Sequence, residues 1–131
     1  MSSINYHNRY FKSVSNSGSG EVDAETIFHY QQQDDIVSAT YQGGAIRFGT
    51  LIAKVASDDS LDMRYQHVNQ QGELMTGKCH SVPEQLSDGR LRMHETWQWT
   101  SGDSSSGTSQ IEEVRSQKSE VRDQNSEVRI Q

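Results

Sequence analysis

The segment 94–99, HETWQW, contains both tryptophans of the chain and one acid among apolar residues. Its first two residues match the start of the H-E-x-x-H zinc motif, but Gln98 stands where the second histidine belongs, and that motif lies on a helix. Apolar and polar residues alternate around the segment, which is typical of a β-strand. On a strand His94 and Glu95 point to opposite faces. The pattern therefore predicts no zinc site and places Glu95 on the same side as the tryptophans.

Other residues that could do chemistry are scattered along the chain. The five histidines lie on different segments, and the one cysteine, Cys79, has no neighbouring base that would lower its pKa. The sequence contains neither a Gly-x-Ser-x-Gly elbow nor a phosphate-binding glycine loop that leads into a helix. We therefore predict no catalytic residue, no metal ligand and no cofactor.

Length and charge narrow the class of protein. A chain of 131 residues suits one domain, and its net charge is -6, with 12 basic and 18 acidic residues. Nucleic-acid binding needs a concentrated basic face, which this balance argues against. No apolar run approaches the ~20 residues of a membrane-spanning helix, and the N-terminus does not resemble a secretory signal. We expect a soluble cytoplasmic protein that binds neither nucleic acid nor membranes.

The C-terminal part has a different composition. From Glu113 onward the chain repeats every seven residues, as EVRSQKS, EVRDQNS and EVRIQ, with one valine in each repeat. A coiled coil needs a second apolar residue per heptad, and glutamine occupies that position here. We predict a low-complexity heptad-repeat tail over 115–131, disordered or partly helical, with an oligomerising helix as the alternative. The folded domain is predicted over 5–114.

Residues 8–114 consist of short alternating segments separated by turn residues. Dipeptides rich in Asp and Gly, at 34–35, 43–44 and 58–59, favour tight hairpins because these residues tolerate positive φ. The only proline, Pro83, is placed at the end of a strand. The expected strands cover 8–16, 26–33, 36–42, 46–57, 60–69, 74–82, 90–100 and 108–114. They predict an all-β, antiparallel up-and-down meander that closes into a small barrel, with an open sheet or a sandwich as the alternative.

Polar side chains share the predicted interior with apolar ones. Alternate residues of a strand face the same side, so the two tryptophans bring Glu95 into the interior with them. A buried carboxylate needs a partner, and Arg47 or Arg9 would supply it. The predicted ligand-binding residues are Glu95, Trp97, Trp99, Tyr65, His67, Tyr41 and Arg47.

Two resemblances rest on these segments. The meander, with WQWTSG at 97–102, resembles the calycin group of lipocalin-like and avidin-like barrels, in which a late tryptophan and a hydroxyl line the ligand pocket. Patterns such as NRYFKSVSN at 8–16 and ETWQWTSGD at 95–103 resemble a family of small bacterial proteins across 5–114. Some members of that family carry the label N-acetylglutamate synthase. Such an acetyltransferase needs an α/β fold and an Arg/Gln-x-x-Gly-x-Gly loop, which this sequence does not contain.

Three functions remain open at this point. We favour a non-catalytic barrel that binds a small molecule or acts as an interaction module, with homo-oligomerisation left open. The second is a small enzyme in which Glu95 or His67 is a general acid or base. The third is a barrel whose interior is filled and which acts through its surface. The volume of the interior and the partner of Glu95 distinguish them.

Overall fold

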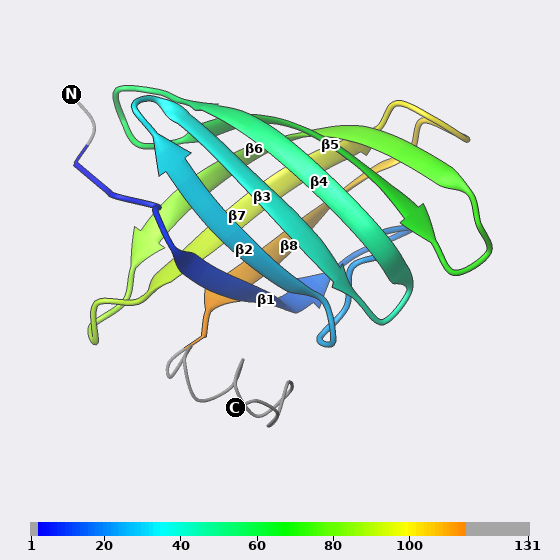
Figure 1. Ribbon diagram of the computed structural model, residues 1–131, viewed down its shortest axis with the longest axis horizontal. Coiled ribbons are helices and arrows are strands. Elements are labelled where there is room, and N and C mark those ends of the chain that lie inside the picture. Colours follow the sequence, from blue (N-terminus) through cyan, green and yellow to red (C-terminus); the bar gives the residue numbers. More distant parts are fainter. Residues whose placement is uncertain (1–2, 115–131) are drawn as a thin grey trace.

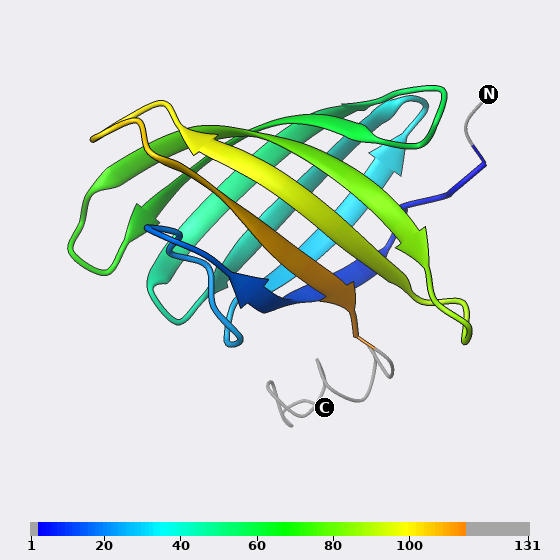
Figure 2. The ribbon, with the colours of Figure 1, turned by 180° about the vertical axis from the view of Figure 1, so that it is seen from behind.

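A computed structural model describes residues 3–114 of the chain. Its eight strands are β1 (Arg9–Asn16), β2 (Ile27–Gln33), β3 (Ile36–Gly43), β4 (Ile46–Val55), β5 (Leu61–Asn69), β6 (Leu74–Gln85), β7 (Leu91–Trp99) and β8 (Ser106–Glu113). Each strand pairs antiparallel with the next (Figure 1), and β8 pairs with β1 to close the barrel (Figure 2). The predicted all-β barrel is confirmed, and the open sheet and the sandwich are excluded.

Two further sequence predictions concern the ends of the chain and the membrane. The predicted repeat tail over 115–131 lies outside the described residues. Within 3–114 the structure contains no helix that could cross a membrane.

Tight turns join β2 to β3 at the predicted dipeptide 34–35, and β3 to β4 one residue beyond the predicted dipeptide 43–44. Asp34 and Asp35 connect β2 to β3, and Gly44 and Ala45 connect β3 to β4. Asp34 has a φ of 55° and Gly44 a φ of 61°. Both values lie in the left-handed region that two-residue hairpins use, because this backbone twist matches the twist of the paired strands.

Strand β6 is longer than the sequence predicts. It continues to Gln85, so Pro83 lies inside the strand and pairs with Met93 of β7. Beyond Ser81, β6 has no partner on its other side, because β5 begins opposite that residue. Proline lacks an N–H group, and a strand tolerates this where one side is free.

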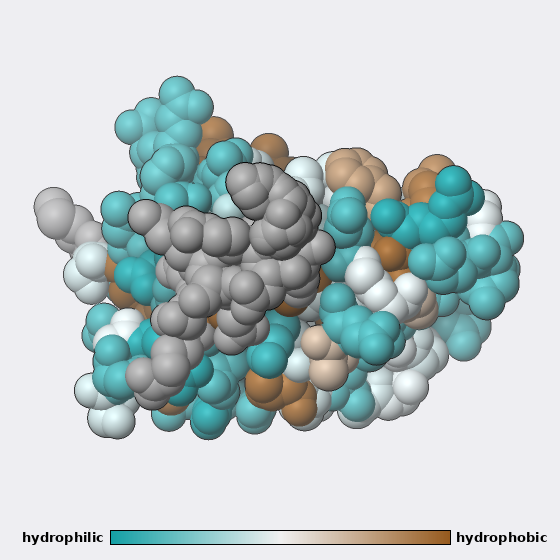
Figure 3. Space-filling model, turned by 60° about the horizontal axis from the view of Figure 1, so that its bottom comes forward, coloured by the Kyte–Doolittle hydropathy of each residue, from teal (hydrophilic) through white to brown (hydrophobic). Residues whose placement is uncertain are grey.

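Strand β4 carries an irregularity near its start. Its register with β5 shifts between Ile46 and Phe48, which indicates one extra residue in β4. Ile46 is buried, whereas Arg47 and Phe48 are both exposed. Most of the coloured surface in Figure 3 is hydrophilic, with apolar residues scattered over it. Single exposed apolar side chains such as Phe48 are ordinary on such a surface.

One end of the barrel, which we call the N-terminal end, is covered by the segment 3–8. Tyr6 is fully buried there and donates a hydrogen bond to the carbonyl of Asp59 at 2.6 Å. The Asp59 carboxylate accepts hydrogen bonds from the amides of Ser3 and Ile4 at 2.9 and 3.1 Å. Large side chains fill the interior behind this segment; the fully buried ones are Phe11, Tyr30, Val37, Leu61, Leu91, Met93 and Ile111.

Candidate ligand cavity

The opposite end, which we call the loop end, has three glycines that leave room for aromatic rings. Each glycine lies opposite an aromatic residue of the neighbouring strand. The pairs are Tyr41–Gly49 (β3 and β4), Tyr65–Gly77 (β5 and β6) and Trp97–Gly107 (β7 and β8). A methyl group added to Gly77 would overlap the hydroxyl end of the Tyr65 ring. The rings therefore lie across the glycines, along the wall of the barrel, and do not fill its centre.

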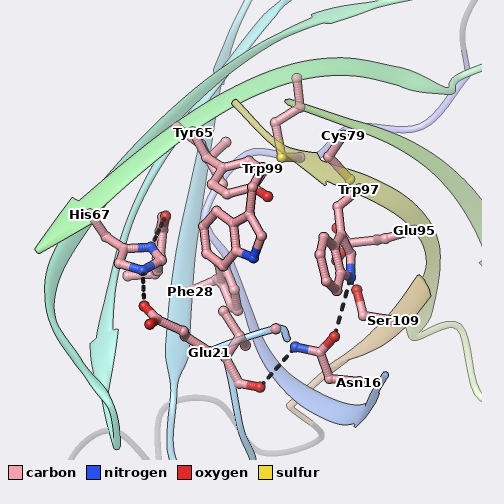
Figure 4. Close-up of a pocket in the computed structure, with 15 residues that line it drawn as sticks. Asn16, Glu21, Phe28, Tyr65, His67, Cys79, Glu95, Trp97, Trp99 and Ser109 are labelled. Carbon is pink, nitrogen blue, oxygen red and sulfur yellow. Dashed lines mark hydrogen bonds and ion pairs between the residues drawn. The ribbon is translucent and has the colours of Figure 1, made fainter. Parts of the chain in front are cut away.

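These rings border a cavity of about 60 Å³ (Figure 4). A water molecule needs roughly 10–15 Å³ of such space, and typical ligand pockets measure about 300–1,000 Å³. The interior at the loop end is therefore not completely filled, but its space is smaller than a typical ligand pocket. Its walls combine aromatic and aliphatic side chains from the strands with residues of the β1–β2 loop, and Glu95, Cys79 and Ser109 lie on one side.

Glu95 extends from β7 into this cavity, where two serine hydroxyls hold its carboxylate. The hydroxyl of Ser109 donates to Oε1 at 3.0 Å, and that of Ser81 donates to Oε2 at 3.3 Å. Burial raises the pKa of Glu95 to about 7, and the two hydroxyls oppose this rise without cancelling it. Among residues 3–114, Glu95 forms no ion pair. When the carboxylate is ionised, only these two hydroxyl donors compensate its charge.

The arginine partners predicted for Glu95 are wrong. Arg9 pairs with Glu113 at 2.7 Å, at the other end of the barrel. Arg47 is exposed and does not line the cavity, because the extra residue in β4 turns it outward where strict alternation would turn it inward. Arg47 therefore does not belong to the candidate site.

His67 lies across the cavity from Glu95 and is fully engaged by its neighbours. The hydroxyl of Tyr41 lies 2.9 Å from Nδ1, and Oε1 of Glu21 lies 2.8 Å from Nε2. A neutral imidazole satisfies both contacts if Nε2–H donates to the carboxylate and Nδ1 accepts from the tyrosine. The second oxygen of Glu21 accepts from the side-chain Nδ2 of Asn69 at 3.0 Å. His67 therefore anchors the β1–β2 loop.

The β1–β2 loop, residues 17–26 with Asn16 before it, covers the loop end through polar contacts. The indole N–H of Trp97 donates to the side-chain oxygen of Asn16 at 3.2 Å, as Figure 4 shows. The indole N–H of Trp99 donates to the hydroxyl of Ser19 at 3.1 Å. The side-chain Nδ2 of Asn16 donates to the backbone carbonyl of Val22 at 3.0 Å. Both tryptophans thus contact the cavity with their rings and the cover with their N–H groups.

A buried hydroxyl lies deeper in the barrel without a partner. The Tyr30 OH group has no hydrogen-bond partner within the described part of the chain. Burial, together with the nearby Glu95 carboxylate, raises its pKa well above the usual value of 10.0, so the group stays neutral. An unpaired buried hydroxyl costs about 1–3 kcal/mol.

The structure brings together six of the seven predicted ligand-binding residues. Those that line the cavity are Glu95, Trp97, Trp99, Tyr65, His67 and Tyr41. Sequence reasoning missed Asn16 and Glu21, because residues next to or within a loop have no periodicity that shows where they point. It also missed Ser81 and Ser109, which strand pairing places directly opposite Glu95. Residues 3–114 contain no group of three or more His, Cys, Asp or Glu side chains placed to hold a metal ion.

The closed eight-stranded antiparallel barrel with an aromatic-lined internal cavity defines a small protein of calycin-like architecture. The family described as Avidin-like protein matches residues 4–114, and the chain belongs to this family. The predicted resemblance to avidin-like barrels is confirmed. Neither the curated proteins nor the solved structures give a significant match.

Proposed function

We propose that this protein binds a small molecule in the cavity at the loop end. The observation that carries the proposal is the Glu95 carboxylate, which faces an aromatic-lined cavity with two serine hydroxyls as its partners. Glu95 is only partly exposed, a charge withdrawn from water without a cation is costly, and a ligand that donates hydrogen bonds would relieve this cost. Membership in an avidin-like family supports the proposal, because eight-stranded barrels can hold one small ligand.

The β1–β2 loop sets the size of the ligand. Asn16, Glu21 and Val22 line the cavity from the side of the cover. A molecule of a few heavy atoms fits beneath them. A larger ligand displaces the loop and breaks the hydrogen bonds from Trp97 and Trp99. Binding of a larger ligand is therefore coupled to opening of the cover.

Catalysis has weaker support than binding. A pKa near 7 suits a general acid or base, but the polar atoms around Glu95 are two serine hydroxyls. His67 contacts Tyr41 and Glu21 and does not assist Glu95. We therefore favour a binding function.

Intrinsic fluorescence provides the test. Both tryptophans of the chain line the cavity, so their emission reports on this site alone. The full chain is screened with a library of small polar metabolites for saturable changes in emission. A compound that binds should do so through the cavity, and the absence of a saturable response from every compound would refute the proposal.

A matched pair of variants localises the binding. Leu51→Phe adds a ring inside the cavity, whereas Ile52→Phe adds the same ring at the next position, which is 56% exposed on the outer surface. We expect binding to weaken at least about tenfold in the first variant, since the pocket is sensitive to single methylene groups. Binding to the second variant should match that of the unmodified protein.

A further inference from the structure

The ionisable groups around the cavity give it an acidic character. Its lining contains the carboxylates of Glu95 and Glu21, the imidazole of His67, which pairs with Glu21, and no lysine or arginine. Glu21 is bonded through both oxygens, to His67 and to Asn69. Glu95 has only the two serine hydroxyls, although an ionised carboxylate can accept about four hydrogen bonds. Glu95 can therefore accept a further donor, and a positive charge would also neutralise it.

Aromatic rings surround the same space. The Tyr65 and Trp97 rings each meet Trp99 with ring centroids 5.9 Å apart, at interplanar angles of 62° and 60°. Phe28 and Tyr41 stack at 4.9 Å on the wall formed by β2 and β3. Rings tilted in this way enclose a space from several sides, and their π-faces attract cations, most strongly where water is excluded.

From these two features we propose that the ligand carries a small organic cation, such as an ammonium or amidinium head group, which Glu95 and the aromatic rings bind together. The inference rests on the proposed function, because it names the chemical class of ligand for the same cavity. The small volume of about 60 Å³ favours a compact head group over a long chain.

The surroundings of Glu95 predict how binding depends on pH. The titratable groups on other strands that lie close enough to Glu95 for its carboxylate to raise their pKa are Tyr30, Tyr41, Tyr65 and Cys79. Burial raises the pKa of each of these well above neutrality, so they remain uncharged. Across the cavity the loop adds Glu21, which His67 binds. With its pKa at about 7, Glu95 ionises around neutral pH. As the pH is raised toward 7, the affinity for a cation should increase about tenfold per pH unit, because a larger fraction of Glu95 is ionised. Above pH 7 the affinity should level off.

The test compares a cation with its uncharged counterpart. The full chain is titrated at pH 8 with choline chloride and with methylammonium chloride, with tryptophan emission as the readout. Two controls are 3,3-dimethylbutan-1-ol, the uncharged isostere of choline, and sodium chloride at equal ionic strength. We expect saturable binding of at least one of the two cations, about tenfold or more tighter than of the alcohol.

Two variants assign the preference to the cavity. Glu95→Gln should abolish the preference for the cation over the alcohol, together with its pH dependence. Glu84→Gln removes an exposed carboxylate on the outer surface and should retain the preference. Equal affinity for cation and alcohol, or a preference that survives Glu95→Gln, overturns the inference and leaves the proposed binding function standing. The absence of a response to both cations also overturns it, and the metabolite screen then decides the binding function separately.

Discussion

Hydrogen-bonded segments cover both the N-terminal end and the loop end of the barrel, but the interiors behind the two covers differ. At the N-terminal end the cover brings a buried side chain, Tyr6, against a filled interior that includes Leu91 and Met93. At the loop end the cover is held by hydrogen bonds to Trp97 and Trp99, and a cavity lies behind it. Apolar packing contributes most of the free energy of folding, whereas polar contacts at a surface exchange readily with water. The difference indicates that one end supports the fold and the other gives access to the interior.

Two acids repeat this contrast. Glu113, at the N-terminal end, accepts hydrogen bonds from Arg9 at 2.7 Å and from the amide of Leu91 at 3.1 Å. Glu95, at the loop end, receives only hydroxyl donors. An acid that serves the fold is paired with a cation, because a lone buried charge is destabilising. An acid left with hydroxyls alone is better explained by a ligand.

The largest difference between the ends is expected from two methionines that both face the interior. Met93 is fully buried at the filled end, and Met63 borders the cavity. Met93→Ala should lower the free energy of unfolding by about 4 kcal/mol, and Met63→Ala by about 2 kcal/mol, because a side chain beside a void loses fewer contacts. Urea denaturation measures both values. Equal losses would contradict the division of the barrel into a filled and an open end.

Substitution of Glu95 and of Glu113 by glutamine should change the stability at pH 8 in opposite directions. The folded protein holds the Glu95 proton more tightly than the unfolded chain, since the pKa rises from 4.5 to about 7. The contribution of Glu95 to the free energy of unfolding is therefore greatest below pH 4.5. It falls by up to about 3 kcal/mol as the pH rises to 7, and stays constant above.

Glu95→Gln should remove this pH dependence and make the protein more stable at pH 8. Glu113→Gln should instead destabilise it by about 2 kcal/mol, because it weakens a charged hydrogen bond to Arg9. Denaturation curves at a series of pH values decide the point. A loss of stability in Glu95→Gln at pH 8 would show that the carboxylate serves the fold.

A smaller effect is expected where a glycine makes room for a ring. Gly77→Ala should cost about 2 kcal/mol, because the added methyl group forces the Tyr65 ring into the cavity. In the double variant with Tyr65→Leu the loss should be less than the sum of the two single losses. Additive losses would show that the ring does not depend on the glycine.

The smallest effect concerns the cover of the loop end. Ser19→Ala removes the hydroxyl that accepts from Trp99 and contacts Ser105. Stability should change by about 1 kcal/mol or less, while amide hydrogen exchange in residues 17–26 should become faster. Exchange at Tyr6, whose amide donates to Gln32 at the other end, serves as the internal control. Faster exchange at both ends would mean that the ends do not open independently.

Most of the structure that was predicted from the sequence followed from the alternation of side chains along a strand. Because side chains alternate on a strand, the pattern around Trp97 and Trp99 was sufficient to place Glu95 inside, and the turn dipeptides gave the hairpins. The same rule failed at Arg47, because one extra residue in β4 reverses the facing of every residue before it. Residues 46–55 are apolar on both faces, which is compatible with a bulge near Gly49 or with a cover on the outer face, so the sequence alone did not show at which residue alternation fails.

The hydrogen-bond partners of Glu95 could not be predicted from the sequence. Ser81 and Ser109 come from the two strands that flank β7, and their position opposite Glu95 depends on the register of both pairings. Glu21 and Asn16 depend on the path of the β1–β2 loop, which no periodicity describes. Contacts along one strand could therefore be predicted, and contacts between strands and loops could not.

The glycine–aromatic pairs have a consequence for how such a barrel can change its ligand. The space inside is determined by atoms that are absent at Gly49, Gly77 and Gly107, on strands whose hydrogen bonding is the same whichever residue stands there. Replacing one of them with alanine alters the shape of the cavity and leaves the strand order intact. Evolution could thus reshape the cavity by single-residue steps on a fixed scaffold, and the residue opposite each inward aromatic would be the place to look for such steps among relatives.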